Sequence, residues 1–315
     1  MAKAFVFPGQ GSQAVGMGKA LGEAFPQARA VYEEVDAALG APLSKIMFEG
    51  PEAELTLTAN AQPALMAVSL AAIRVLEAEA GLDLSRDAKF VAGHSLGEYS
   101  ALAAAGALSI ADTARLLRLR GQAMQAAVPV GEGAMAALIG VEFDAAREIA
   151  EAAAAAEGKV CQIANDNGGG QIVVSGAKAA VEKAILIAKE RGVKRAVPLP
   201  VSAPFHCALM QPAAEAMREA LATTTILAPK LPVVANVTAS PIVSPDDIRR
   251  LLVEQVTGTV RWRECVAYMA GEGVDRFVEC GAGKVLTGLL KRIASEAKGV
   301  AVGAPEDLDA YRTFV

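Results

Sequence analysis

A serine stands between two glycines in the segment Gly93-His94-Ser95-Leu96-Gly97. A short apolar run, residues 88–92, precedes it, and an alanine-rich helical pattern, residues 96–107, follows it. A Gly-x-Ser-x-Gly segment between a strand and a helix is typical of a nucleophile elbow, where the turn strains the serine and the glycines leave room for neighbouring chain. The N–H groups that open the helix would favour an oxyanion beside that serine. Because the chain has 29 glycines, the five-residue pattern also arises by chance, and its flanking elements carry the prediction.

A serine nucleophile needs a base, and the chain contains two histidines, His94 and His206. His94 adjoins the serine, and neighbours across a sharp turn tend to diverge. His206 lies far downstream, where Pro200 and Pro204 stiffen the backbone. A lone histidine is more often a structural residue. Because no other imidazole is available, His206 is the candidate base.

A glycine-containing turn, residues 8–12, follows the first apolar run, residues 4–7. Its backbone N–H groups could face the same sheet edge as the serine. The spacing Gly9-x-Gly11-x-x-Ala14 also fits the dinucleotide-binding fingerprint, which needs an acidic residue about 20 positions on, at the end of a second strand. The acidic residues at that distance lie in a helical pattern instead, which disfavours a dinucleotide site.

Strand-like and helical segments alternate in the first part of the chain, which predicts a parallel sheet with helices on both faces. Apolar runs predict strands over residues 4–7 and 88–92. Helical periodicity covers residues 16–39, 60–80, 96–107 and 110–128, with Pro63 expected in the first turn of a long buried helix.

The pattern changes after Pro129. Strands are expected over 133–141, 160–166, 171–176 and 194–200, and helices over 144–158 and 177–192. This βαββαβ order is ferredoxin-like. The sequence therefore predicts an α/β chain with a large domain, residues 1–129 and 200–315, and a small ferredoxin-like domain inserted at residues 130–199.

Composition narrows the classes of function. Hydrophobic residues make up 53% and charged residues 21%, which is typical of a globular chain. The net charge of −5 disfavours nucleic-acid binding. Four dispersed cysteines disfavour a zinc site or a disulfide framework. The N-terminal apolar run breaks at Pro8, too early for a signal peptide, and charges interrupt the alanine-rich runs. We expect no membrane span and a cytoplasmic protein.

Six segments resemble motifs of the malonyl-CoA:acyl carrier protein transacylase family and occur in the same order: FVFPGQGSQ, GHSLGE, RLRGQAMQ, GAMAALIG, SAPFHCALM and ECGAGKVLTGLLKRI. The resemblance covers almost the whole chain, and the joint occurrence is more specific than any single motif. It implies an α/β-hydrolase-like large domain with a ferredoxin-like small one, similar to the pattern above.

The resemblance also implies a ping-pong reaction. A malonyl group would pass from malonyl-CoA to Ser95 and then to the phosphopantetheine thiol of acyl carrier protein, supplying fatty acid biosynthesis. His206 would act as general base and acid. The backbone N–H groups of Gln10 and Leu96 match the oxyanion hole of the family. Gln255 matches a residue whose backbone carbonyl orients the histidine, so no acidic triad member is expected.

Three further residues match substrate-binding positions of the family. Arg120 matches the arginine that holds the malonyl carboxylate, a task for which a planar guanidinium is suited. Its helical neighbours Arg115 and Arg118 are expected to be solvated. Gln62 matches a glutamine near the pocket, and Phe205 resembles a phenylalanine that precedes the histidine in malonyl-selective acyltransferases. Neither a metal nor a permanently bound cofactor is expected, and the chain is expected to be a monomer.

Two other classes remain open. A serine hydrolase would share the nucleophile and base but have no use for Arg120. A non-catalytic carrier-binding protein would need neither. Because acyl carrier proteins are typically acidic, a local basic patch must attract the carrier to this acidic chain. The candidates are two clusters: Lys189, Arg191, Lys194 and Arg195, and Lys284, Lys291 and Arg292.

Overall fold

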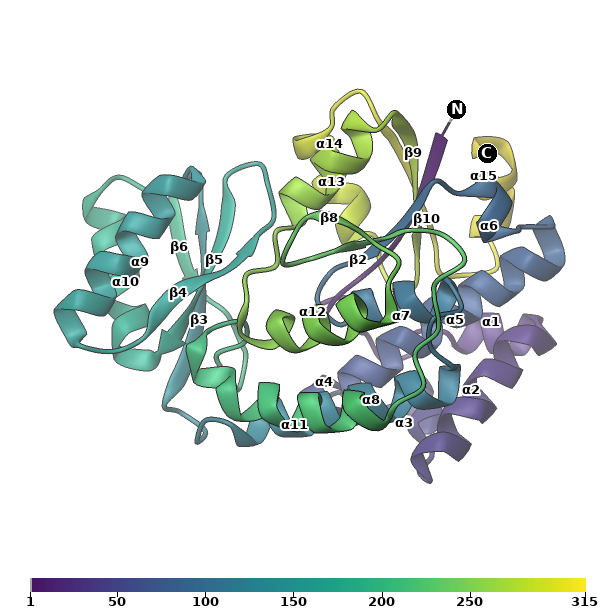
Figure 1. Cartoon of the computed structure of the whole chain (residues 1–315), viewed down its shortest axis with the longest axis horizontal. Coiled ribbons are helices and arrows are strands. Elements are labelled where there is room, and N and C mark those ends of the chain that lie inside the picture. The colour runs from purple at the N-terminus through teal and green to yellow at the C-terminus, as the bar shows by residue number, and fades with distance from the viewer. Residues whose placement is uncertain (1) are drawn as a thin grey trace.

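The computed structural model describes residues 2–315 and contains two sheets (Figure 1). The larger sheet has six strands in the order β10-β9-β1-β2-β7-β8. Its strands are β1 (Ala2–Phe7), β2 (Phe90–Gly93), β7 (Val233–Ala235), β8 (Ser240–Ile242), β9 (Val274–Cys280) and β10 (Lys298–Val302). All neighbouring pairs are parallel except β7 and β8, which are antiparallel at one edge.

Strand β1 shows why this sheet forms from apolar runs without a polar face. Phe5 and Phe7 point into one hydrophobic core, whereas Ala4 and Val6 point into another on the opposite face. The first core includes helices α2 (Pro26–Leu39), α5 (Thr58–Ala80), α7 (Gly97–Ala104) and α8 (Ile110–Ala126); the second includes α13 (Trp262–Gly271) and α14 (Val285–Ile293). A parallel sheet buried on both faces requires such continuous apolar strands.

The first helical region differs from the expected single helix over residues 16–39. It forms α1 (Lys19–Ala24) and α2, separated by Phe25 in an extended conformation. Pro26 disfavours a helical conformation at the residue before it and then occupies the first position of α2. Two helices that were not expected follow, α3 (Leu43–Glu49) and α4 (Glu52–Thr56).

Helix α5 begins two residues earlier than expected, so Pro63 lies inside the helix and not in its first turn. By length and a mean hydropathy of 1.3, α5 is the one helix within residues 2–315 that is apolar enough to cross a membrane. However, 89% of its most apolar window is buried inside the protein. It is therefore a core helix, packed against α2 and α8.

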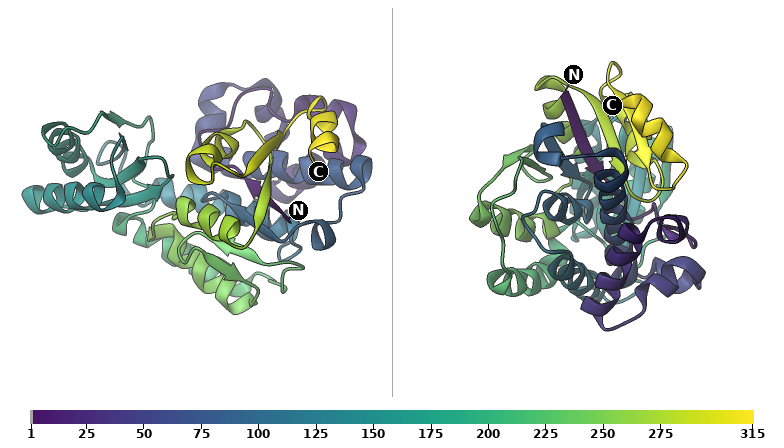
Figure 2. Two further views of the ribbon diagram at one scale, coloured as in Figure 1. Left: turned by 90° about the horizontal axis from the view of Figure 1, so that it is seen from above. Right: turned by 90° about the vertical axis from the view of Figure 1, so that its right-hand side faces the viewer.

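The smaller sheet is antiparallel, with the strand order β4-β5-β3-β6. Along the chain its elements are β3 (Gly133–Ile139), α9 (Phe143–Glu157), β4 (Cys161–Asp166), β5 (Gln171–Ala177), α10 (Lys178–Glu190) and β6 (Arg195–Pro198). They enclose a separate hydrophobic core and project from the larger part (Figures 1 and 2).

Two backbone hydrogen bonds connect the small sheet to the segment before α13. The Val260 N–H donates to the Ala164 carbonyl at 2.8 Å, and the Asp166 N–H donates to the Val260 carbonyl at 2.9 Å. An ion pair between Arg263 and Asp166, at 2.7 Å, reinforces the junction. These contacts hold the end of β4 against the start of α13 and the segment before it. The other helices are α6 (Leu84–Asp87), α11 (Gln211–Thr223), α12 (Pro245–Thr257), α15 (Asp307–Phe314) and a short 3₁₀ turn, Ala208–Met210.

Candidate active site

Ser95 lies in the sharp turn between β2 and α7, with a left-handed φ of 54°. A left-handed conformation at a residue other than glycine costs about 1–3 kcal/mol and is often found at functional sites. The flanking glycines are required by close packing. A Cβ at Gly93 would collide with the backbone of Gly97, and a Cβ at Gly97 would collide with the Phe7 carbonyl. The sequence therefore folds here into a strained elbow at the carboxyl end of a parallel strand.

His206 is within hydrogen-bond distance of Ser95, although the two residues are far apart in the sequence. The distance from Ser95 Oγ to His206 Nε2 is 2.7 Å, and His206 Nδ1 lies 2.9 Å from the main-chain oxygen of Gln255. Because that oxygen can only accept, Nδ1 carries the proton and Nε2 is left to accept from the serine hydroxyl. Burial, followed by the charge of Arg120, lowers the pKa of His206 to about 3. The imidazole is therefore neutral at ordinary pH, as a base must be.

Arg120 approaches the same hydroxyl from α8. Its Nη2 donates to Ser95 Oγ at 3.2 Å and to Gln255 Oε1 at 2.9 Å, and its Nη1 donates to Gln62 Oε1 at 2.7 Å. The side chain is 1% exposed. Nε has no partner within residues 2–315. A buried guanidinium with unused N–H groups beside a hydroxyl is suited to an anionic group attached to that hydroxyl.

Two backbone N–H groups near Ser95 belong to Leu96 and Gln10. Leu96 is the residue before α7, and its N–H points from the start of that helix. In the described chain neither N–H donates a hydrogen bond. The Gln10 side chain is held by the Thr58 hydroxyl, which donates to Oε1 at 3.0 Å. Free N–H groups at a helix start can stabilise a developing oxyanion.

These groups line one cleft of about 520 Å³ between the two sheets. Gln62, Phe205 and the residues above reach it, together with an apolar wall that includes Met124, Met135, Leu199 and Val201. Phe205 is 8% exposed and lies next to the histidine. The structure thus brings Ser95, His206, Arg120, Gln62, Gln10, Leu96 and Phe205 to one cavity, with Gln255 directly behind it.

Comparison with protein families matches residues 4–304 to the acyl transferase domain family. This chain belongs to that family. It is 47% identical over 97% of its length to the malonyl CoA-acyl carrier protein transacylase of Bacillus subtilis, covering 95% of that protein. The acyl-carrier-protein-S-malonyltransferase structure from Bartonella henselae is 60% identical, with a TM-score of 0.96 and coverage of 99% and 98%. A solved complex of a type II PKS acyl-carrier protein with its malonyl-transacylase is 41% identical to this chain, with a TM-score of 0.95 and coverage of 99% of each chain.

Two residues of this acyl transferase that sequence reasoning missed support the elbow. Asn236 Oδ1 accepts from the Ser95 N–H at 2.8 Å, and its Nδ2 donates to the Gly93 carbonyl at 2.7 Å. Glu98 accepts from the Asn236 N–H at 3.0 Å. Asn236 directly follows β7, the strand beside β2. A polar residue at the carboxyl end of a buried strand is the pattern by which the sequence could have identified it as a site residue.

The second histidine has a different environment. His94 Nε2 lies 2.9 Å from Asn167 Oδ1, and its ring packs near Trp262. Burial is the main reason that the pKa of His94 is lowered. The imidazole therefore connects the elbow to the turn between β4 and β5 and has no contact with the Ser95 hydroxyl in the described hydrogen bonds.

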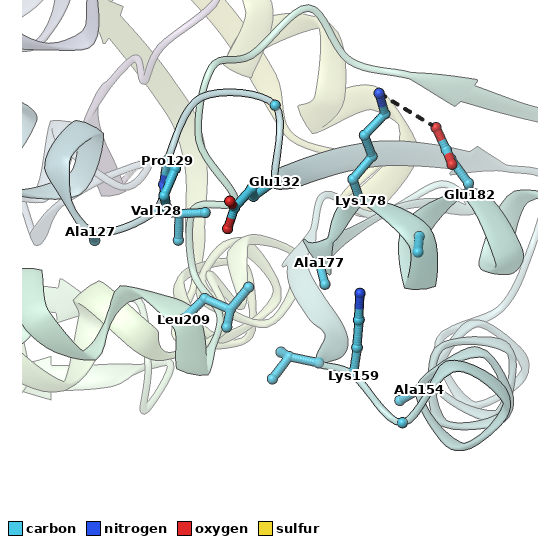
Figure 3. A pocket seen from close by; sticks show the side chains of 14 residues that line it. Ala127, Val128, Pro129, Glu132, Ala154, Lys159, Ala177, Lys178, Glu182 and Leu209 are labelled. Atoms are coloured by element: carbon cyan, nitrogen blue, oxygen red, sulfur yellow. Dashed lines mark ion pairs between the residues drawn. The ribbon is translucent and has the colours of Figure 1, made fainter.

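A larger surface hollow, of about 1120 Å³, lies where α8 leads into the small sheet (Figure 3). Its charged side chains include Glu132, Lys159, Lys178 and Glu182, and Lys178 pairs with Glu182 at 4.0 Å. The fourteen described residues that line it include no serine, cysteine or histidine. The larger hollow therefore lacks a serine or cysteine nucleophile and a histidine base, whereas the smaller cleft at Ser95 contains both a candidate nucleophile and a candidate base. No group of three or more potential metal ligands gathers within residues 2–315.

Proposed function

We propose that this acyl transferase moves the malonyl group of malonyl-CoA to the phosphopantetheine thiol of acyl carrier protein. Its relatives bear the names of that activity, and one of them was solved with an acyl-carrier protein. The observation that carries the proposal is the buried Arg120 guanidinium, 3.2 Å from Ser95 Oγ. A hydrolase of neutral esters has no need for a buried cation at that position, whereas a malonyl ester needs one.

The reaction follows from the hydrogen bond between Ser95 and His206, which together form a catalytic dyad. Ser95 Oγ attacks the thioester carbonyl while its proton passes to His206 Nε2. The Leu96 and Gln10 N–H groups hold the oxyanion. When the carbon–sulfur bond breaks, His206 returns the proton to the departing CoA sulfur and a malonyl ester remains on Ser95. The carrier thiol then gives its proton to His206 and attacks the ester carbonyl. As the bond to Ser95 Oγ breaks, His206 returns the proton to that oxygen, and the malonyl group remains on the carrier sulfur.

The acyl selectivity would come from the cleft around Ser95. Arg120 holds the free carboxylate through its unused N–H groups, and Gln62 fixes the guanidinium at 2.7 Å. Phe205 crowds the carbon between the two carbonyls, which disfavours a 2-methyl branch. The reaction requires no bound metal or cofactor, since malonyl-CoA is the substrate and CoA the first product.

The arrangement of the chain is part of this proposal. We assign residues 130–199 to an inserted ferredoxin-like domain, because its elements follow the βαββαβ order in a four-stranded antiparallel sheet. Residues 1–129 and 200–315 would form an α/β-hydrolase-like domain around the parallel strands. A cytoplasmic monomer agrees with four free, buried cysteines and with a site supplied by one chain.

A mass-spectrometric assay tests the function. The protein is incubated with malonyl-CoA, the label is located by peptide mapping, and then either carrier protein or buffer alone is added. We expect a malonyl adduct on Ser95 that is stable in buffer and transfers to the carrier. Rapid loss in buffer would indicate a hydrolase, and the absence of any adduct would indicate a binding protein.

A further inference from the structure

A buried carboxylate lies directly behind the Ser95 turn and takes no part in the reaction described above. Glu98, in the first turn of α7, is 0% exposed. Its Oε2 accepts from Gln255 Nε2 at 2.7 Å and from the Asn236 N–H at 3.0 Å. Its Oε1 has no partner among the described residues. Burying a carboxylate with one oxygen unsatisfied is costly, so its presence needs a reason.

The Gln255 amide connects this carboxylate to the site. Its Oε1 accepts from Arg120, and its Nε2 donates to Glu98 and to the Ser95 carbonyl, the latter at 3.0 Å. Guanidinium groups only donate, whereas carboxylate and carbonyl oxygens only accept. The amide can therefore satisfy all its neighbours in only one orientation. The main-chain oxygen of the same residue holds His206, so Gln255 contacts both the base and the cation.

The charges around Arg120 are unbalanced without Glu98. The described hydrogen-bond partners of the guanidinium are all neutral: Gln62, Gln255 and the Ser95 hydroxyl. The titratable groups that interact with Glu98 are Arg120 on α8, Tyr99 on α7 and Cys265 on α13. Burial raises the pKa of both Tyr99 and Cys265, so these two are neutral at ordinary pH. Glu98 and Arg120 are thus a buried pair of opposite charges separated by one amide.

We propose that Glu98 is a positioning residue that orients the Gln255 amide toward Arg120 and supplies its counter-charge while no malonyl group is present. This rests on the proposed function, in which Arg120 binds the malonyl carboxylate. When the ester forms, the malonyl carboxylate brings a second negative charge to the same guanidinium. Glu98 then takes one proton from solvent onto its unpartnered oxygen, and the site returns to neutrality.

This exchange has a pH signature with a definite sign. Burial raises the pKa of Glu98 to about 7, against hydrogen bonds from Asn236 and Gln255 and the charge of Arg120, which lower it. Glu98 is therefore ionised above that pH in the unacylated protein, and a malonyl carboxylate raises its pKa further. Malonylation is thus linked to proton uptake and becomes less favourable as the pH rises.

The test compares malonyl-CoA with acetyl-CoA from pH 6 to 9. Dividing their kcat/KM values for acylation cancels the titration of groups that both donors share. We expect the malonyl-to-acetyl ratio of the wild type to fall between pH 7 and 8.5, by up to about sixteenfold, the limit that linkage to one proton gives for a group whose pKa in the unacylated protein is about 7. Glu98→Gln keeps the acceptor oxygen and removes the charge, so its ratio should be flat.

Glu279→Gln is the matched control. Glu279 is another buried carboxylate with a raised pKa, but its oxygens accept from Leu286 and Thr287 at the start of α14. This variant should keep the wild-type slope. A flat wild-type ratio, or a Glu98→Gln ratio that falls like the wild type, would overturn the proposal.

If Glu98→Gln does not fold, a measurement on the wild type alone still tests the proposal. A pH indicator in weak buffer at pH 7.5 should record proton uptake during a single round of malonylation and none during acetylation. Equal signals from the two donors would refute the counter-charge role. Failure to form any malonyl adduct would instead refute the proposed function, so the two failures can be told apart.

Discussion

Replacing Arg120 with alanine should weaken malonyl transfer far more than acetyl transfer. A guanidinium has five N–H donors, and three hydrogen bonds to Gln62, Gln255 and Ser95 use part of that set. The remaining donors, including the unpartnered Nε, are available for a carboxylate in the cleft. Acetyl-CoA has no such carboxylate, so it reports on the dyad and oxyanion hole alone.

The magnitude follows from burial. Arg120 is 1% exposed, so a malonyl carboxylate left without it would be a buried charge lacking a partner. Removing one member of a buried ion pair costs about 3–5 kcal/mol. At about 1.4 kcal/mol per factor of ten, kcat/KM for malonyl-CoA should fall by about 10²- to 10⁴-fold. The value for acetyl-CoA should change by less than about tenfold, or rise, because acetyl-CoA has no carboxylate for the guanidinium to hold and the buried cation is then absent.

The assay is stopped-flow or quenched acylation with each donor, followed by intact-protein mass measurement. Arg118→Ala is the matched control, since Arg118 lies on the same helix and outside the cleft lining. Arg120→Lys keeps the charge but not the planar fork and should fall between the wild type and alanine. Equal losses of kcat/KM for the malonyl and acetyl donors would show that Arg120 supports the fold or the dyad and does not recognise the malonyl carboxylate.

Further predictions concern the cleft, the stability of the fold and the carrier surface. Ser95→Ala should abolish the adduct with malonyl-CoA and leave the circular dichroism spectrum unchanged; an adduct on the variant would refute the nucleophile assignment. His206→Ala should lower acylation by about 10²- to 10⁴-fold. Since the folded pKa of His206 is depressed to about 3, its contribution to the free energy of unfolding is present above pH 6.5 and lost as the pH falls, which urea unfolding at pH 5 and 7.5 can detect. Phe205→Ser should accept methylmalonyl-CoA better than the wild type does, and no gain would contradict the steric role. Charge reversal in either basic cluster should raise the KM for carrier protein without slowing malonylation, and the defect should shrink with salt; steady-state assays at two ionic strengths test this for Lys194→Glu with Arg195→Glu and for Lys291→Glu with Arg292→Glu.

Packing around the turns brings Lys194 and Arg292, one residue from each basic cluster, to adjoining turns. The Lys194 side chain lies against Gly140, and the Arg292 side chain lies against Gly169. The Gly140 N–H donates to the Gly170 carbonyl at 2.8 Å, so these glycine turns adjoin at one end of the small sheet. The same end includes Asn167, which contacts His94 beside the elbow. We therefore expect an acidic carrier that docks at this end to contact Lys194 and Arg292 together, so both double reversals should raise its KM.

Local patterns in the sequence were sufficient for the elbow and for the order of the small-sheet elements. The Gly-x-Ser-x-Gly spacing predicts a turn whose glycines are required by contacts within a few residues and with β1. The strands and helices of residues 133–198 each have their own period and turn residues. By contrast, the break between α1 and α2 was missed because the helical period continues through it, and only Phe25 and Pro26 interrupt the backbone.

The long-range polar contacts could not be predicted in the same way. Three arginines share α8, and only burial separates Arg120, inside the cleft, from Arg115, which pairs with Asp112 at the surface. Resemblance to a family selected Arg120; periodicity alone would not have done so. Asn236 contacts the elbow from the end of β7, and the partners of Glu98, namely Asn236 and Gln255, come from distant elements whose placement depends on the whole fold. No local pattern contains that information.

Among the described residues His206 has no acidic hydrogen-bond partner, and this has an electrostatic rationale. The position of a triad acid is taken by the Gln255 carbonyl, 2.9 Å from Nδ1, and the side chain of the same residue contacts Arg120. A carboxylate there would pair with the guanidinium and occupy N–H groups that an acyl carboxylate needs. It would also repel that acyl carboxylate by about 4 kcal/mol at a separation of 4 Å near a protein surface, and by more in a drier site. A neutral carbonyl orients the imidazole without adding charge. Glu98, separated from the guanidinium by the Gln255 amide, balances its charge without occupying those donors, so the cation stays available to an acidic acyl group.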